Sequence, residues 1–194
     1  ISEIPQDLKF AGEETTAEIG ERTVIREFVT INRGTSQHWK TVVGSDCLLM
    51  AYVHIAHDCI VGNQVILANA VNLAGHVEIE NWVIIGGLVA VQQFSRIGQH
   101  SIIGGHYRVP KDVPPYIMAA REPLRYEGLN LVGLKRRNFP PETILALKRA
   151  YTLIYNSEYN VSDAIKKIEE TPELMIPEVR NVIEFIKKSS RGII

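Results

Sequence analysis

The sequence contains little cysteine: of its 194 residues, only Cys47 and Cys59 carry a thiol. Two cysteines are too few for a disulfide framework, and their spacing matches no zinc-binding pattern. We therefore expect both to be buried free thiols that pack as small hydrophobic side chains, rather than catalytic or metal-binding groups.

The sequence also lacks an excess of charge of either sign and any long apolar run. Its 21 lysine and arginine residues nearly balance 22 aspartate and glutamate residues, so we predict no nucleic-acid partner. No apolar stretch approaches the roughly 20 residues that a transmembrane segment needs. No secretory signal is visible, and a cytoplasmic protein is predicted. Because residue 1 is isoleucine rather than methionine, we also expect residues to be missing from the N-terminus.

The strongest pattern in the sequence is a six-residue repeat. Every sixth residue from Val43 to Val109 is isoleucine, leucine or valine, and three upstream isoleucines lie in the same phase. Gln37 alone breaks the series, and residues 35–41 around it are interpreted as a loop insertion. Internal repetition at a short fixed period is typical of a solenoid.

A second series lies four residues after each aliphatic position, and its members are small or β-branched. A period of six matches neither an α-helix nor a single strand. It predicts a triangular coil of three short strands, one hexapeptide per side, with both series inside. The residue after the aliphatic position is often glycine, which we expect to permit the corner backbone. Coils stack by parallel strand pairing, so a mainly β fold, with a parallel β-helix over residues 1–116, is predicted.

Residues 117–194 are predicted to form a connecting segment and a C-terminal α-helical domain. Three prolines within residues 109–116 end the repeat, because proline cannot donate a hydrogen bond in strand pairing. We expect Ser162 to cap the second helix and the third helix to end near Gly192. The helices should pack on the open end of the solenoid and cover its strand edge. The predicted helical segments are residues 140–157, 160–170 and 177–192.

Most of the histidines that could carry chemistry lie close together in the sequence. His54, His57 and His76 fall within 23 residues, and Asp58 directly follows His57. Because three hexapeptides make a coil of 18 residues, Gly75 and Gln93 should follow His57 along one edge of the solenoid. His76 should likewise lie one coil beyond Asp58. The predicted polar cluster comprises His54, His57, Asp58, Asn72, His76 and Gln93.

Such a cluster on a rigid scaffold can assist the transfer of a group to an alcohol. A neutral His57 can act as the general base, Asp58 can orient the imidazole ring, and the N–H of Gly75 can bind a developing oxyanion. The alternatives are histidines that merely face solvent and a zinc site made by two histidines and Asp58. Three histidines in register beside a glycine favour the catalytic interpretation.

Seven segments of the sequence carry a family resemblance that covers almost the whole chain. They are PQDLKFAGE, INRGT, VGSDCLLMAYVHIAHDCIVGN, VILANAVNLAGHV, IIGGLVAVQQF, DVPPY and GLNLVGLKRRNF. Together they resemble the UDP-N-acetylglucosamine O-acyltransferases of lipid A biosynthesis. HIAHDC and LAGHV are shared in looser form with other hexapeptide acyltransferases, whereas GLKRRNF followed by helices is more particular to this family.

The resemblance implies a left-handed β-helix, an exception to the usual right-handed crossover, and a chain that lacks the family's first few coils. It also implies a homotrimer with active sites in clefts between neighbouring solenoids. The family moves an (R)-3-hydroxyacyl group from acyl carrier protein to the 3-hydroxyl of UDP-N-acetylglucosamine, the first step of lipid A biosynthesis. Neither a metal nor another cofactor is implied.

Matched position by position, the resemblance assigns roles to single residues. His57 corresponds to the catalytic base, Asp58 to its orienting partner and Gly75 to the oxyanion donor. Gly105 corresponds to the acyl-chain ruler at the floor of the acyl groove, where a glycine leaves room for a long chain. The substrate-binding residues implied are Asp7, Lys9, His54, His76, Gln93, Asn130, Arg136 and Arg137. Candidates for contact with an acidic carrier protein are Arg121, Arg125, Lys148 and Arg149.

Three positions depart from the family pattern. Asn32 and Gln92 stand where histidine is common, and Val132 replaces an acidic residue near the nucleotide. None is the proposed base, so these departures bear on sugar and nucleotide preference rather than on mechanism. The rival functions are the later N-acyltransferase of the same pathway, a non-catalytic solenoid that binds partners, and a carbonic anhydrase-like zinc protein.

Overall fold

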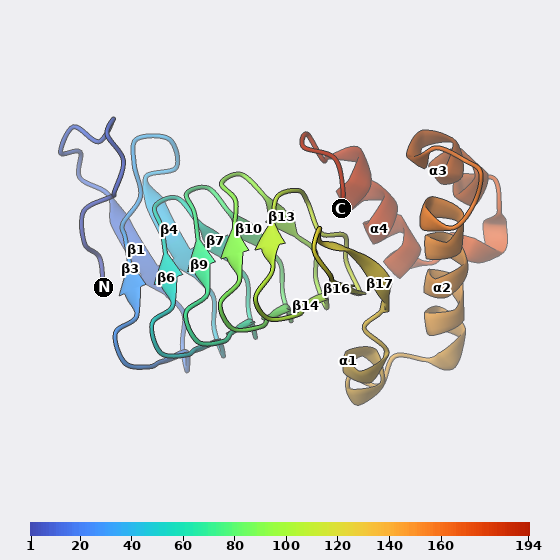
Figure 1. Cartoon of the computed structure of the whole chain (residues 1–194), viewed down its shortest axis with the longest axis horizontal. Coiled ribbons are helices and arrows are strands. Elements are labelled where there is room, and N and C mark those ends of the chain that lie inside the picture. Colours follow the sequence, from blue (N-terminus) through green and yellow to red (C-terminus); the bar gives the residue numbers. More distant parts are fainter.

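A three-sided β-helix occupies the N-terminal part of the structure, and a helical region follows it (Figure 1). The computed structural model describes all 194 residues. Most strands are only two residues long, because each forms one side of a triangular coil. The strands are β1 (Thr16–Ile19), β2 (Val24–Ile25), β3 (Thr30–Ile31), β4 (Lys40–Val43), β5 (Leu48–Leu49), β6 (His54–Ile55), β7 (Ile60–Val61), β8 (Ile66–Leu67), β9 (Asn72–Leu73), β10 (Glu78–Ile79), β11 (Ile84–Ile85), β12 (Ala90–Val91), β13 (Arg96–Ile97), β14 (Ile102–Ile103), β15 (Arg108–Val109), β16 (Ile117–Ala120) and β17 (Arg125–Leu129).

Three sheets form the three sides of the solenoid. Their strand orders are β1-β4-β7-β10-β13, β17-β16-β14-β11-β8-β5-β2 and β15-β12-β9-β6-β3. Neighbouring strands pair in parallel, except that β16 and β17 are antiparallel. The predicted parallel β-helix of hexapeptide repeats is therefore confirmed.

The strand register confirms the coil length. His54 pairs with Asn72 and Ile55 with Leu73, an offset of 18 residues. Between the first two coils the offset is 24, since Thr30 pairs with His54. The six extra residues lie between β3 and β4, in the predicted loop insertion around Gln37.

The two sequence series fill the interior of the β-helix. The aliphatic residues from Val43 to Val109 are at most 3% exposed, and Cys47, Cys59, Ser95 and Ser101 are buried among the small residues. Because neighbouring coils cover one another at the strand spacing of about 4.8 Å, this apolar surface leaves water only when coils stack. The two cysteines are free thiols, as expected.

Residues other than glycine form the corners in the left-handed conformation. Positive φ angles recur three residues after the aliphatic positions, for example at Asp58 (59°) and His76 (62°). The prediction that glycine permits the corner backbone is wrong. Gly86 has no positive φ, and a Cβ added to it would lie 2.5 Å from the backbone nitrogen of Gly105. Glycine is needed there because successive coils approach too closely for a side chain.

The segment after the repeat contains more structure than the sequence predicted. Strand β16 continues the seven-stranded sheet, β17 pairs with it, and the short helix α1 had not been predicted. The side chain of Asn160, rather than Ser162, caps α3 by accepting from the N–H of Asp163 at 2.9 Å. The last helix ends at Lys187 rather than near Gly192. The helices are α1 (Leu131–Arg136), α2 (Pro141–Tyr155), α3 (Val161–Glu169), the 3₁₀ helix η1 (Pro172–Leu174) and α4 (Pro177–Lys187).

The helical region closes the C-terminal end of the β-helix, as predicted (Figure 1). Tyr151 on α2 is fully buried, and its hydroxyl donates to the carbonyl oxygen of Pro115 at 2.6 Å. Arg96 of β13 contacts α4, with its guanidinium 4.3 Å from the ring centroid of Phe185. None of the helices combines the length and the apolar character that crossing a membrane requires.

Candidate active site

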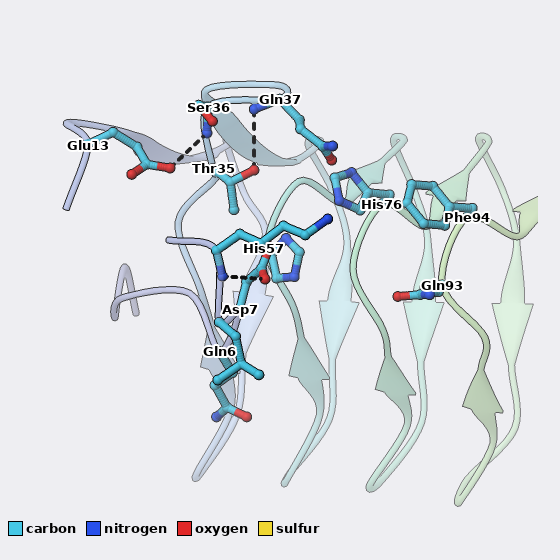
Figure 2. Close-up of a pocket in the computed structure, with 12 residues that line it drawn as sticks. Gln6, Asp7, Glu13, Thr35, Ser36, Gln37, His57, His76, Gln93 and Phe94 are labelled. Carbon is cyan, nitrogen blue, oxygen red and sulfur yellow. Dashed lines mark hydrogen bonds between the residues drawn. The ribbon is translucent and has the colours of Figure 1, made fainter. Parts of the chain in front are cut away.

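A groove of about 530 Å³ lies along one corner of the β-helix, beside the loop insertion (Figure 2). The N-terminal segment and the loop contribute one group of lining side chains, and the corner residues of successive coils contribute the other. The groove therefore brings together five of the predicted site residues. Its lining residues are Gln6, Asp7, Leu8, Lys9, Glu13, Thr35, Ser36, Gln37, His57, His76, Gln93 and Phe94.

His57 lies directly against Gly75 of the next coil, as the coil arithmetic predicted. A Cβ added to Gly75 would lie 2.6 Å from Cε1 and 2.7 Å from Nε2 of the His57 ring. Any larger residue at position 75 would therefore displace the imidazole. Only a glycine allows the ring and the backbone of the next coil to come this close.

The backbone N–H of Gly75 donates no hydrogen bond within the protein. At another corner of the same solenoid, the N–H groups two residues after the aliphatic positions, which correspond to that of Gly75, donate hydrogen bonds to side chains of the next coil. There the N–H of Ser45 donates to Oδ1 of Asn63 at 2.8 Å, and the N–H of Asn63 donates to Oδ1 of Asn81 at 2.7 Å. In the column of Gly75 the residue of the next coil is Gln93, whose side chain makes no such hydrogen bond, so the Gly75 N–H stays available beside His57.

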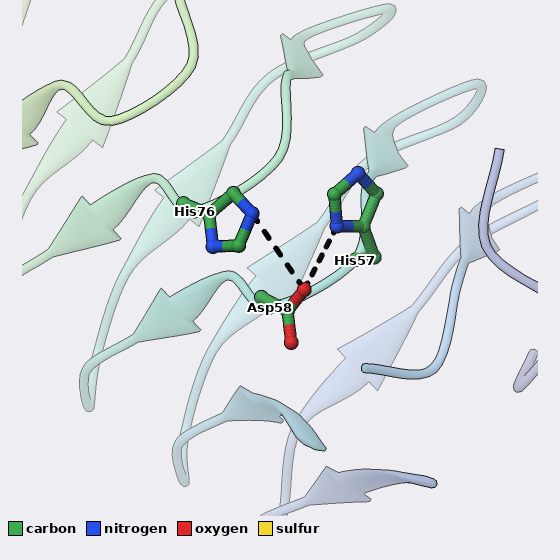
Figure 3. Close-up of side chains that lie close together, drawn as sticks. All are labelled: His57, Asp58 and His76. Carbon is green, nitrogen blue, oxygen red and sulfur yellow. Dashed lines mark hydrogen bonds and ion pairs between the residues drawn. The ribbon is translucent and has the colours of Figure 1, made fainter. Parts of the chain in front are cut away.

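The buried carboxylate of Asp58 fixes the orientation of His57 (Figure 3). Its Oδ2 lies 2.9 Å from Nδ1 of His57 and accepts from the hydroxyl of Thr35 at 2.6 Å, while its Oδ1 accepts from the Thr35 N–H at 2.8 Å. Burial alone would raise the pKa of Asp58, but the hydrogen bonds from Thr35 and His57 hold that pKa below its ordinary value. The carboxylate stays ionised and can only accept hydrogen bonds. Nδ1 of His57 therefore carries the proton, and Nε2 has a free lone pair.

His76 forms the wall of the groove next to this pair. Its Nε2 lies 3.7 Å from Oδ2 of Asp58, and its ring stacks on Phe94 with the centroids 4.5 Å apart. Burial lowers the pKa of His76 below the ordinary histidine value, although Asp58 opposes this change. His76 therefore presents a neutral aromatic surface to the groove and adds no positive charge beside His57.

Seven of the twelve lining residues were not predicted as site residues, among them Phe94 and Thr35. Phe94 lies 18 residues after His76, so the coil arithmetic could have found it. Thr35 lies in the loop insertion, outside the six-residue phase, and no periodic signal pointed to its bond with Asp58. Asn32, one of the departures from the family pattern, donates to the carbonyl oxygen of Ile4 at 3.1 Å. It thereby holds the N-terminal segment that contributes Asp7 and Lys9.

His57, Asp58 and His76 present ligand atoms within 4.8 Å of one another, so they could hold a metal ion. The hydrogen bonds favour a different use of these groups. Both oxygens of Asp58 already accept from Thr35, and Nδ1 of His57 must keep its proton to donate to Asp58. The arrangement is that of a proton-transfer pair.

The remaining predicted site residues lie elsewhere on the same chain. His54 lies on the outer face of β6, where its Nδ1 is 2.7 Å from the hydroxyl of Thr30, and burial lowers its pKa. Gly105 lies at a second corner, where a Cβ added to it would be 3.2 Å from the carbonyl oxygen of Gly87. The third corner contacts the segment that contains the other predicted binding residues. These are Asn130, Arg136 and Arg137.

Comparison with known proteins identifies the family. A sequence profile described as UDP-N-acetylglucosamine O-acyltransferase, domain 2, matches residues 112–194, and one described as bacterial transferase hexapeptide (six repeats) matches residues 40–75. The crystal structure of the UDP-N-acetylglucosamine acyltransferase from Bacteroides fragilis is 47% identical with a TM-score of 0.96, over 100% of this chain and 76% of that chain. The chain belongs to the UDP-N-acetylglucosamine O-acyltransferase family.

Two further solved members of the UDP-N-acetylglucosamine O-acyltransferase family agree with this assignment. The protein from Moraxella catarrhalis is 44% identical with a TM-score of 0.94, over 100% of this chain and 75% of that chain. The protein from Acinetobacter baumannii is 41% identical with a TM-score of 0.95, over 100% of this chain and 76% of that chain. The fold is thus the predicted left-handed parallel β-helix with a C-terminal helical region.

The hydrogen bond from Thr35 to the buried Asp58 carboxylate predicts a pH-dependent loss of stability in Thr35→Val. Because the pKa of Asp58 in the folded protein is below the ordinary value of 3.8, its ionised carboxylate stabilises the fold at pH values well above 3.8. This stabilisation is lost as the pH falls through the pKa of the folded protein. Without the hydroxyl the pKa rises, so the variant should be less stable at pH 7 by about 1.5–3 kcal/mol. The difference should shrink as the pH falls below 3.8.

Unfolding of the two proteins by urea between pH 7 and pH 3 measures this difference. Thr23→Val is a matched control, because the Thr23 hydroxyl donates to the uncharged carbonyl oxygen of Gly44 at 2.7 Å. Its effect should not change with pH. An equal loss for Thr35→Val at both ends of the range would contradict the charge-assisted bond.

Proposed function

We propose that the protein transfers an (R)-3-hydroxyacyl group from acyl carrier protein to the 3-hydroxyl of UDP-N-acetylglucosamine. The observation that carries this proposal is the free Nε2 lone pair of His57 beside the unpaired N–H of Gly75. Acyl transfer to an alcohol needs a general base and a donor for the oxyanion, and these two groups supply both. The names of the relatives support the sugar nucleotide as the acceptor.

The reaction proceeds by direct attack. Nε2 of His57 removes the 3-hydroxyl proton as the sugar oxygen bonds to the thioester carbonyl carbon, and the carbonyl electron pair moves to the oxygen. The Gly75 N–H donates to this oxyanion, while Asp58 stabilises the imidazolium. The oxyanion collapses, the carbon–sulfur bond breaks, and the leaving thiolate takes the proton from His57. No acyl-enzyme forms, and the residues need no cofactor for any step.

Polar groups around the base suit a sugar substrate. Asp7, Lys9 and Gln93 line the same groove as His57, and they offer both donors and acceptors for hydroxyl groups. The family profile over residues 112–194 is that of an O-acyltransferase, which favours ester formation over the rival N-acylation. Since the substrates are a sugar nucleotide and a carrier protein, the proposal includes the predicted cytoplasmic location.

The division of the candidate residues among three corners supports a homotrimer. Gly105 and Arg136 cannot reach the groove of His57 within one chain, because they lie at its other two corners. In a closed ring of three protomers, a given corner of one protomer lies against a different part of the surface of the neighbouring protomer. A cleft between two protomers would therefore combine the base of one chain with the ruler and the nucleotide-binding cations of the other.

Removal of the base tests the mechanism. His57→Ala should lower kcat by about 10²- to 10⁴-fold, because general-base assistance is lost. The assay is incubation with UDP-N-acetylglucosamine and a set of hydroxyacyl carrier proteins, with detection of the acylated product by mass spectrometry. The melting temperature and the oligomeric state serve as controls for folding. A folded, assembled variant that keeps near-full activity would rule out His57 as the base.

Mixing two defective chains tests the composite site. His57→Ala and Arg136→Ala, co-expressed in equal amounts, should recover about one quarter of the wild-type sites, because each site draws one residue from each of two neighbours. Turnover at a low concentration of UDP-N-acetylglucosamine measures the recovery. Activity no greater than the average of the two separate variants would mean that the site is not shared between chains.

The size of residue 105 should set the acyl-chain length. Gly105→Met should shift the preference toward shorter chains, because the added side chain shortens the apolar groove. Competition among carrier proteins with acyl groups of different lengths measures the preference. Ala51→Met is the control, since residue 51 lies three coils away in the same corner column. An unchanged preference in Gly105→Met would show that residue 105 is not the ruler.

A further inference from the structure

Three aromatic rings stack along the third corner of the β-helix, which contacts the residues at both ends of α1. Trp82, His100 and Tyr116 occupy the left-handed corner position of successive coils. The centroids of Trp82 and His100 are 6.0 Å apart and those of His100 and Tyr116 are 5.6 Å apart, with interplanar angles of 9° and 12°. Phe139 packs edge-on against His100 at 5.0 Å. We name Trp82, His100 and Tyr116 the aromatic column.

Arg137 lies on this column. Its guanidinium carbon is 4.8 Å from the centroid of the Trp82 ring, and its Nη2 donates to the carbonyl oxygen of Trp82 at 3.3 Å. Its Nη1 is buried, so this edge of the guanidinium is turned away from solvent. Burial lowers the pKa of Arg137. The neighbouring Arg136, in contrast, is exposed.

Asn130 anchors the other end of α1 to the same column. Its Oδ1 accepts from the N–H of Gly133 at 3.1 Å, and its Nδ2 donates to the carbonyl oxygen of His100 at 2.8 Å. Its own N–H donates to the carbonyl oxygen of Tyr116 at 2.8 Å. With these groups engaged and only 6% of the residue exposed, Asn130 holds the N-terminal end of α1 against the aromatic column.

Gly133 leaves room for the side chains of Asn130 and Arg137, which both pass close to its Cα. A Cβ added to Gly133 would lie 2.8 Å from Nη1 of Arg137 and would also clash with the amide of Asn130. The helix has only six residues, too few to be stable without tertiary contacts. Its placement, and with it the direction of Arg136, therefore depends on the contacts of Asn130 and Arg137 with the aromatic column.

We propose that the two adjacent arginines have different roles. Arg137 is a positioning residue that anchors α1 to the aromatic column, and Arg136 is the cation that meets the diphosphate of the nucleotide sugar. The inference rests on the proposed function for the identity of the ligand. It divides between two residues a role that the family resemblance gives to both.

Lysine substitutions distinguish the two roles. Lysine keeps the point charge that a phosphate needs but loses the planar group that stacks on an indole ring. Arg136→Lys, which keeps a point charge at the phosphates but loses the planar fork, should therefore raise the KM for UDP-N-acetylglucosamine about 3-fold, while Arg137→Lys should raise it about 10-fold. Both variants should keep kcat within about 2-fold, because neither residue touches the reacting atoms.

The aromatic column provides the matching test. Trp82→Leu should raise the same KM about 10-fold, and Trp82→Phe, which keeps a ring face, should restore most of the loss. Hydrogen exchange of residues 131–137 should quicken in Trp82→Leu and in Arg137→Lys but not in Arg136→Lys. Gln64→Leu is the control, since Gln64 has the corner position one coil before Trp82 and makes no hydrogen bond with α1.

The inference is overturned if Arg137→Lys matches the wild type in both KM and hydrogen exchange, or if Trp82→Leu changes neither. Failure of the proposed function gives a different result: the wild-type protein would then form no acylated UDP-N-acetylglucosamine. The hydrogen-exchange comparison needs no substrate, so it tests the anchoring role even in that case.

Discussion

The direct stacking of each coil on the next is the constraint on which the rest of this structure depends. Parallel pairing at about 4.8 Å places residues 18 apart in contact, whatever their chemistry. The same spacing buries the aliphatic series, excludes side chains where coils approach most closely, and sets the ring of His57 against Gly75. Core and candidate active site are thus two consequences of one repeat.

The buried charge of Asp58 then determines which nitrogen of His57 can act as a base. An ionised carboxylate without exposure to water needs donors on both oxygens, and Asp58 obtains them from Thr35 and His57. Because Asp58 must accept a hydrogen bond from His57, Nδ1 of His57 carries the proton, and Nε2 is left as the base. Thr35 comes from the loop insertion, which shows how a break in the repeat supports the site that the repeat positions.

Much of this could be read from the sequence, because periodic contacts obey arithmetic. The β-helix, its interior and the neighbourhood of His57, Gly75 and Gln93 follow from periods of six and 18. Contacts outside the phase could not be found in this way. The bond from Thr35 depends on the path of an insertion, and α1 is too short to have a helical period of its own. The allocation of Arg136 and Arg137 to exposed and anchored positions depends on packing that no single-sequence pattern encodes.

The most direct test of the central claim is nitrogen-15 NMR of the His57 ring at roughly pH 8, where an ordinary imidazole is neutral. The signal can be assigned by its loss in His57→Gln. If Asp58 orients the ring as described, Nδ1 carries the proton and Nε2 has the shift of an unprotonated nitrogen. A proton on Nε2 instead would contradict the account, because His57 would then have no lone pair with which to accept the hydroxyl proton.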